Sequence, residues 1–186
     1  MSSKKLKWLS KDMKFYNIFN PSATRSNWTN LLKTFSQIIV FWLFFLYIVP
    51  NGIVVFQSYL GIRDFLGFEL GGWILFFCCS ILGLYSGWTM SWKGKGTPLP
   101  MDCPNILVID GPYKYVRNPM AVAGIGQGIS VGLILGSWLV ILYAISGAFL
   151  WHYFVRPAEE ADLECRFGND FNEYKKKIGL WWPKQL

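Results

Sequence analysis

The sequence has few of the residues from which a metal centre or a disulfide framework is built. It contains one histidine, His152, and only four cysteines, none of which forms a C-x-x-C pair. Zinc sites draw on several closely spaced histidine and cysteine ligands, and disulfide frameworks need paired cysteines. We therefore expect no metal site and no disulfide framework. The cysteines are Cys78, Cys79, Cys103 and Cys165.

Charged residues are also scarce, and most of the net charge comes from the N-terminal stretch. Only 16% of the residues are charged, 53% are hydrophobic, and the mean hydropathy is +0.30, which is high for a soluble chain. Residues 1–33 lack the apolar core of a signal peptide and carry +6 of the net charge of +7. A basic arm beside apolar segments favours an anionic membrane leaflet over nucleic acid. Residues 4–16 are expected to form an amphipathic helix on that surface or a solvated tail.

Two apolar segments without a charged residue predict membrane-spanning helices. They cover residues 35–59 and 71–92, and about 20 apolar residues of helix cross the hydrocarbon core. Pro50 is expected to kink or end the first helix. Gly83 and Gly87 in the second would let a neighbouring helix approach closely.

Proline and glycine interrupt the apolar pattern over residues 93–118, which predicts a long, partly buried loop. Between residues 120 and 155, His152 is the one side chain that ionises near neutral pH. With a turn at Gly136-Ser137, this stretch predicts a hairpin of two more spans. Its first arm places four glycines on one face, where another backbone or a ligand can come close. They are Gly124, Gly128, Gly132 and Gly136.

The sequence thus predicts an all-α, polytopic membrane protein with about four transmembrane helices. We expect a basic cytoplasmic or interfacial arm (1–33) and a pair of transmembrane helices (34–92). A C-terminal region (93–186) would hold the hairpin, a cytoplasmic loop and a C-terminal helix. Lysine and arginine are frequent in the arm, the loop and the C-terminal stretch, whereas Arg63 stands alone between residues 60 and 70. The positive-inside rule therefore predicts a multi-pass protein with both termini in the cytoplasm.

Charged residues gather at the cytoplasmic ends of the predicted hairpin. Arg117 precedes the third span, and Glu159 and Glu160 follow the fourth, so folding should bring Arg117 close to Glu159. Arginine suits a carboxylate and glutamate suits an ammonium or a ribose diol, so a small zwitterion would fit between them. Two alternatives stay open. Arg117 would also serve as an anchor at the membrane surface, and the two glutamates would also complement a helix dipole.

Three motifs follow one another within residues 94–183. They are G-x-G-T-P-x-P, then L-V-x-x-G-P-Y-x-Y-V-R-N-P-M, then E-E followed by F-G and Y-K-K-K. In this order they resemble the isoprenylcysteine carboxyl methyltransferase and phospholipid methyltransferase superfamily. The resemblance implies an all-helical membrane methyltransferase. Such an enzyme binds S-adenosylmethionine in its cytoplasmic loop and hairpin ends, and admits a lipidic or prenylated substrate from the membrane.

Carried over position by position, the resemblance implies a cofactor site and a substrate contact. Glu159 matches the cofactor-binding acid, and Arg156 lies within one position of a substrate-binding arginine. Our candidate catalytic residues are Arg117 and Glu160. Many family members have histidine in place of Asn118 and tyrosine in place of Ala121. The implied cofactor contacts are Asn105, Ile106, Leu107, Val108, Tyr113, Asn118, Pro119, Met120, Ala121 and Glu159.

The type of methyl acceptor depends on whether the site holds a base. A carboxylate is already nucleophilic, whereas an amine must first lose a proton. Asn118 cannot act as a base at neutral pH. His152 shares a helical face with Arg156 and Glu159, but a histidine held by its neighbours is the favoured interpretation. The sequence therefore favours carboxyl or other O-methylation of the isoprenylcysteine type.

Three alternatives remain at this point. The first is phospholipid N-methylation by the same fold. The second is a reductase of the sterol type, which would bind a nicotinamide cofactor. The third is a non-catalytic membrane subunit whose glycine faces pack partner helices.

Overall fold

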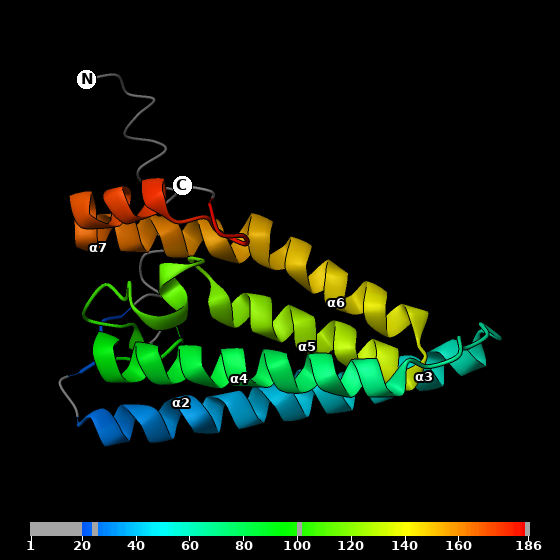
Figure 1. Ribbon diagram of the computed structural model, residues 1–186. Coiled ribbons are helices and arrows are strands. Elements are labelled where there is room, and N and C mark those ends of the chain that lie inside the picture. Colours follow the sequence, from blue (N-terminus) through cyan, green and yellow to red (C-terminus); the bar gives the residue numbers. More distant parts are fainter. Residues whose placement is uncertain (1–19, 24–25, 100–101, 185–186) are drawn as a thin grey trace, which may run out of the picture.

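The protein is helical throughout most of the computed structural model, which describes residues 20–23, 26–99 and 102–184 (Figure 1). The predicted all-α polytopic fold is confirmed, whereas the expected helix at 4–16 lies outside the described residues. The elements are α2 (Asn27–Phe41), η1 (Trp42–Ile48), α3 (Val49–Tyr59), α4 (Glu69–Gly94), η3 (Gly111–Lys114), α5 (Pro119–Leu135), α6 (Trp138–Leu150), η4 (Trp151–Val155) and α7 (Arg156–Lys177).

Three helices are long and apolar enough to cross a membrane. They are Asn27–Tyr59, Glu69–Gly94 and Trp138–Lys177. The shorter apolar helix, Pro119–Leu135, has 17 residues and therefore extends about 26 Å at the helical rise of about 1.5 Å per residue. It packs between α4 and α6 (Figure 1). The four predicted segments therefore exist as helices, but only three of them reach the length of a full span.

The first long helix begins earlier than predicted and does not end at Pro50. It continues to Tyr59, and the wider π-helical turn η1 lies directly before the proline. Proline lacks an N–H group and its ring collides with the carbonyl one turn earlier, so a locally wider turn accommodates it. The same arrangement recurs where η4 precedes Pro157. It is this second wide turn that joins the apolar part of α6 to the charged helix α7.

The predicted hairpin is confirmed, with α5 and α6 joined at Gly136, whose φ of 62° suits glycine. Two of the aligned glycines face α6 at short range. A Cβ atom on Gly128 would lie 2.9 Å from the Cβ of Ala144, and one on Gly132 would collide with Ile141. The close contact predicted for this face is therefore present at these two glycines.

Helix α7 reverses direction at Gly168, where φ is 51° and ψ is −120°. An L-amino acid with a side chain rarely adopts this conformation, so glycine allows the reversal. The second arm then runs back along the end of the bundle (Figure 1). It buries Phe171 completely, and the Tyr174 hydroxyl donates to the Tyr113 carbonyl at 2.7 Å. The reversal thus returns the Y-K-K-K motif to the loop that precedes α5.

Candidate functional site

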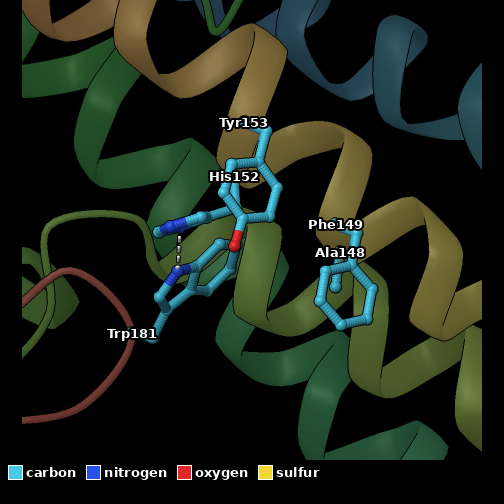
Figure 2. A pocket seen from close by; sticks show the side chains of 5 residues that line it. All are labelled: Ala148, Phe149, His152, Tyr153 and Trp181. Atoms are coloured by element: carbon cyan, nitrogen blue, oxygen red, sulfur yellow. Dashed lines mark hydrogen bonds between the residues drawn. The ribbon is translucent and has the colours of Figure 1, made fainter.

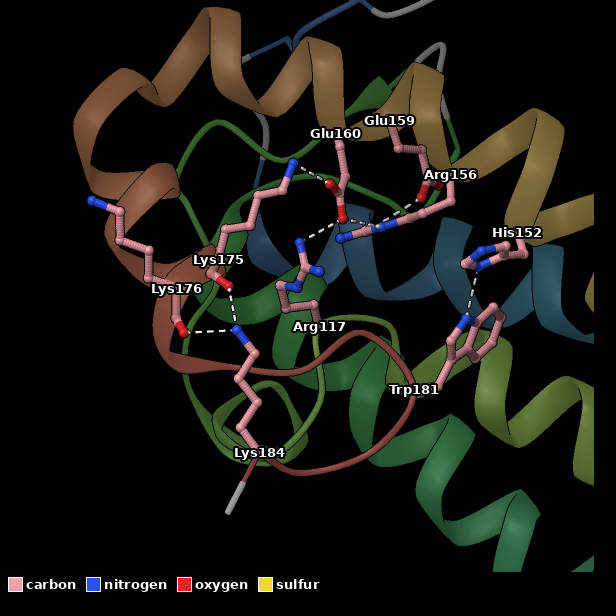
Figure 3. A network of polar contacts seen from close by, with 9 residues as sticks. All are labelled: Arg117, His152, Arg156, Glu159, Glu160, Lys175, Lys176, Trp181 and Lys184. Atoms are coloured by element: carbon pink, nitrogen blue, oxygen red, sulfur yellow. Dashed lines mark hydrogen bonds and ion pairs between the residues drawn. The ribbon is translucent and has the colours of Figure 1, made fainter. Parts of the chain in front are cut away.

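A network of charged side chains joins the start of α5 to both arms of α7 (Figure 3). Arg117 pairs with Glu160, and Lys175 Nζ lies 2.6 Å from Glu160 Oε2. Arg156 binds both acids, with Nη1 3.1 Å from Glu159 Oε2 and Nε 3.1 Å from Glu160 Oε1. The side chains of Arg117 and Arg156 are only 9% and 7% exposed. The network is therefore largely removed from bulk water, where charge pairing is strongest.

Local sequence explains how Arg117 is placed. Asn118 is the N-cap of α5, and its side-chain oxygen accepts from the Ala121 N–H at 3.4 Å. Pro119 occupies the first helical position, which proline favours. Because the helix must begin here, Arg117 is held at its entrance. The Arg117 N–H also donates to the carbonyl of Gly179 at 2.8 Å.

The hairpin brings Arg117 to the two acids, but its direct partner differs from the expected one. Arg117 pairs with Glu160, whereas Glu159 bonds to Arg156. Consecutive residues of an α-helix point about 100° apart, since about 3.6 residues make one turn. The two carboxylates therefore point in different directions and pair with different sets of side chains. The sequence motif places both at the site but does not reveal which one faces Arg117.

The electrostatic surroundings of the two acids also differ. Both acids come directly after the apolar part of the helix. That part, residues 138–155, contains no aspartate, glutamate, lysine or arginine. Burial raises the pKa of Glu159, and Arg156 offsets this only in part. Burial also acts to raise the pKa of Glu160, but the hydrogen bond from Lys175 and the charges of Arg156 and Arg117 together lower it. Glu160 is therefore the firmly ionised partner, and Glu159 takes up a proton more readily.

Three buried polar atoms at the start of α5 have no hydrogen-bond partner among the described residues. They are the Tyr113 hydroxyl, Arg117 Nε and Asn118 Nδ2. Leaving such a group unpaired costs about 1–3 kcal/mol, and buried polar groups are nearly always satisfied. Burial raises the pKa of Tyr113, so its hydroxyl keeps its proton. All three groups are therefore hydrogen-bond donors without an acceptor among the described residues.

Two adjoining hollows open beside the network. The larger, of about 410 Å³, is lined by Arg117, Arg156 and Glu160 among others. The smaller, of about 300 Å³, is mainly aromatic and includes Tyr153 (Figure 2). His152 lines both hollows. A polar recess at one end of the bundle is thus joined to an apolar recess on the membrane helix.

None of the ten implied cofactor contacts, the stretch 105–108 and Tyr113, Asn118 and Glu159 included, lines the charged hollow. The Asn105 side chain donates to the carbonyls of Ser22 and Lys95, at 2.9 and 3.3 Å. Val108 is buried against Gly94, and Ile106 is 47% exposed. Asn105 therefore connects the N-terminal segment to the long loop. Leu107 is half-buried, and Met120 and Ala121 belong to the first turn of α5. The cofactor contacts implied for these residues stay predictions.

Some residues of this site were outside the predicted set. Lys175 contacts Glu160 directly. Its position in the Y-K-K-K motif was the one feature of the sequence that could have indicated a role at this site. Trp181 donates its indole N–H to His152 Nδ1 at 3.0 Å. No sequence pattern indicates that contact, because the two residues meet only after the chain reverses at Gly168. It also agrees with the interpretation of His152 as a histidine held by a neighbour.

The fold and this site define a helical integral membrane protein with a buried charged network at one end of its bundle. The sequence model of the phospholipid methyltransferase family matches residues 69–170, from the start of α4 into α7. This match covers more than half of the chain. The chain therefore belongs to the phospholipid methyltransferase family, whose members are methyl-transferring enzymes. The family resemblance seen in the motifs is confirmed.

A second comparison agrees with the first. Over 76 residues the chain is 33% identical to protein-S-isoprenylcysteine O-methyltransferase of Schizosaccharomyces pombe. The match covers 40% of this chain and 31% of that protein. The chain thus matches less than a third of the length of this relative.

Proposed function

We propose that the protein transfers a methyl group from S-adenosylmethionine to a lipid-soluble acceptor. The observation that carries this proposal is the buried charged network together with three unpartnered polar groups at its edge. Structural ion pairs do not require free donors beside them, because a folded chain normally satisfies its buried polar atoms. A small polar ligand would supply the missing partners.

The site residues fit the zwitterionic part of this cofactor. S-adenosylmethionine supplies an electrophilic methyl group on a sulfonium sulfur when it is bound. The unpartnered N–H groups of Arg117 and Asn118 suit its carboxylate. Glu159 suits its ammonium or ribose hydroxyls, and the Tyr113 hydroxyl is a further donor. The main task of these residues is to orient the donor and to exclude water from the reacting atoms.

We propose a carboxylate as the acceptor, which gives O-methylation of the isoprenylcysteine type. Glu160 is held by three cations and its pKa is lowered, which makes it a poor proton acceptor. His152 Nδ1 already accepts the Trp181 N–H. A carboxylate acceptor needs no base, so it suits these residues. The name of the fission-yeast relative supports the same choice.

Phospholipid N-methylation is the second candidate, because the family model that matches the chain carries that description. An amine acceptor would need a proton acceptor at the site. Glu159, with its raised pKa, is the residue best suited to that task.

The chemical stability of the product separates these candidates. The purified protein in lipid–detergent micelles would be given methyl-labelled S-adenosylmethionine and a total lipid extract. We expect label in a lipid product, and base treatment should release it as volatile methanol because a methyl ester is hydrolysed. Label that resists base would exclude a methyl ester, and its recovery on a methylated amine headgroup would identify an N-methyl product. No transfer, together with no binding of S-adenosylmethionine in a calorimetric titration, would favour a non-catalytic subunit.

We also propose that the charged site and both termini face the cytoplasm, since the lysines and arginines that the structure describes gather at the charged end, apart from Arg63. The test uses a variant in which every native cysteine is serine. Lys114→Cys, at an exposed residue near the site, should react with an impermeant maleimide only from the cytoplasmic side. Arg63→Cys, in the exposed loop at the opposite end, should react only from the other side. Labelling of both from one side would contradict this topology.

A further inference from the structure

The segment after α7, residues 178–184, folds back across the charged network (Figure 3). Its Gly179 carbonyl accepts the Arg117 N–H at 2.8 Å, and Gly179 also forms a parallel bridge with Val116. Lys184 Nζ donates to the Lys176 carbonyl at 2.8 Å, near the end of α7. The segment therefore touches the backbone of Arg117, two residues before α5 begins.

A side-chain bond connects this segment to η4, at the end of the apolar part of the helix. The Trp181 indole N–H donates to His152 Nδ1 at 3.0 Å, and the two ring centroids lie 6.1 Å apart. His152 belongs to η4, the wide turn at the end of α6. Because Nδ1 accepts this bond, a neutral His152 ring carries its proton on Nε2. The contact also lies where the charged and the aromatic hollows meet.

We propose that the Trp181–His152 hydrogen bond is a latch that holds residues 178–184 over the charged hollow and so positions Arg117. Trp181 and His152 are then positioning residues, and His152 is not the base of the reaction. The inference rests on the proposed function in one respect, namely that Arg117 binds the methyl donor.

The argument follows from the other contacts of the segment. The Lys184 bonds and the Trp181–His152 bond are all exposed to solvent, but the Lys184 bonds reach only the carbonyls of Lys175 and Lys176, at the end of α7. The hydrogen bond from the Arg117 N–H to the Gly179 carbonyl requires Gly179 to stay in place. It therefore depends on the other contacts that hold the segment. Among the hydrogen bonds of the described residues, the Trp181–His152 bond is the one that attaches the segment to η4, beside the apolar part of the helix. Its loss should let Gly179 move away from Arg117 while the hairpin stays intact.

Four variants separate the hydrogen bond from the bulk of the rings. Trp181→Phe removes the donor and keeps an aromatic ring, and His152→Ala removes the acceptor. His152→Gln supplies a side-chain oxygen that can accept the same N–H, so it should restore the latch. The matched control is Trp182→Phe, at the next residue, whose side chain is 81% exposed.

The first measurement is amide hydrogen exchange of a peptide that contains Arg117. A net hydrogen bond is worth about 0.5–1.5 kcal/mol, so we expect exchange about fivefold faster in Trp181→Phe and His152→Ala. Exchange in His152→Gln and Trp182→Phe should match the wild type, and peptides from the α5–α6 hairpin should be unchanged in all four. Unchanged exchange at Arg117 in both latch variants would overturn the proposal.

The second measurement is the affinity for S-adenosylmethionine by calorimetric titration. We expect binding about fivefold weaker in Trp181→Phe and His152→Ala, with recovery in His152→Gln. Faster exchange at Arg117 with unchanged affinity would overturn the positioning role. A wild-type protein that does not bind S-adenosylmethionine would remove the proposed function, and the exchange result would still decide whether the latch exists.

Discussion

Replacement of Arg117 with alanine is expected to weaken the binding of S-adenosylmethionine about 100-fold or more. The variant removes a buried cation that pairs with Glu160 and carries an unpartnered Nε atom. Truncation of one partner in a buried, hydrogen-bonded charge pair between protein and ligand costs about 2–5 kcal/mol of binding free energy, and about 1.4 kcal/mol corresponds to a tenfold change in affinity. Calorimetric titration of the purified variant measures the effect, and methyl transfer should fall in parallel.

The fold should survive this change, because Glu160 keeps Arg156 and Lys175 as partners. Thermal unfolding in micelles checks this point. The matched control is Arg63→Ala, an exposed arginine outside the charged end of the bundle, which should bind like the wild type. Arg117→Lys keeps the charge but loses the planar pair of donors, so it should recover only part of the affinity. If Arg117→Ala binds normally, the assigned donor site is wrong.

Replacement of Arg156 with methionine should have the largest effect on stability, a loss of about 3–5 kcal/mol in the free energy of unfolding. Arg156 contacts both acids, and among the described residues it is the one hydrogen-bond partner of the Glu159 carboxylate. The variant therefore leaves Glu159, whose side chain is 20% exposed, as an acid without a partner among the described residues. Chemical unfolding in mixed micelles measures the loss.

The size of this loss should depend on pH. Burial already raises the pKa of Glu159 in the folded protein, and the variant removes the cation that lowers it. An acid whose folded pKa exceeds its unfolded pKa destabilises the protein when ionised and has no such effect when protonated. The deficit of Arg156→Met should therefore be largest at neutral pH and shrink as the pH falls through the folded pKa of Glu159.

A double variant tests the same cause independently. Arg156→Met with Glu159→Gln carries no buried charge at position 159, so it should recover part of the lost stability. An equal deficit at every pH, or no recovery in the double variant, would show that packing of the Arg156 side chain is responsible instead.

Much of the fold could be predicted because its cause is local. Long apolar runs specify helices that cross a membrane, and Gly136 allows a tight turn between two of them. The effect of Pro50 was not predictable in the same way. Proline excludes a regular helix turn, but the sequence does not say whether the chain stops or widens there. In the structure the turn widens, and the helix continues to Tyr59.

The order of residues along the chain determined that this protein spans a membrane, that its last apolar helices form a hairpin, and that Arg117 meets a pair of acids. Hydropathy and turn formation depend on residues that are close together in the chain, so both can be recognised in the sequence alone. Only the tertiary structure decided that Glu160 faces Arg117 and that Trp181 reaches His152. Those contacts depend on the angle between adjacent side chains on α7 and on the reversal at Gly168, which together set distances between residues far apart in the chain.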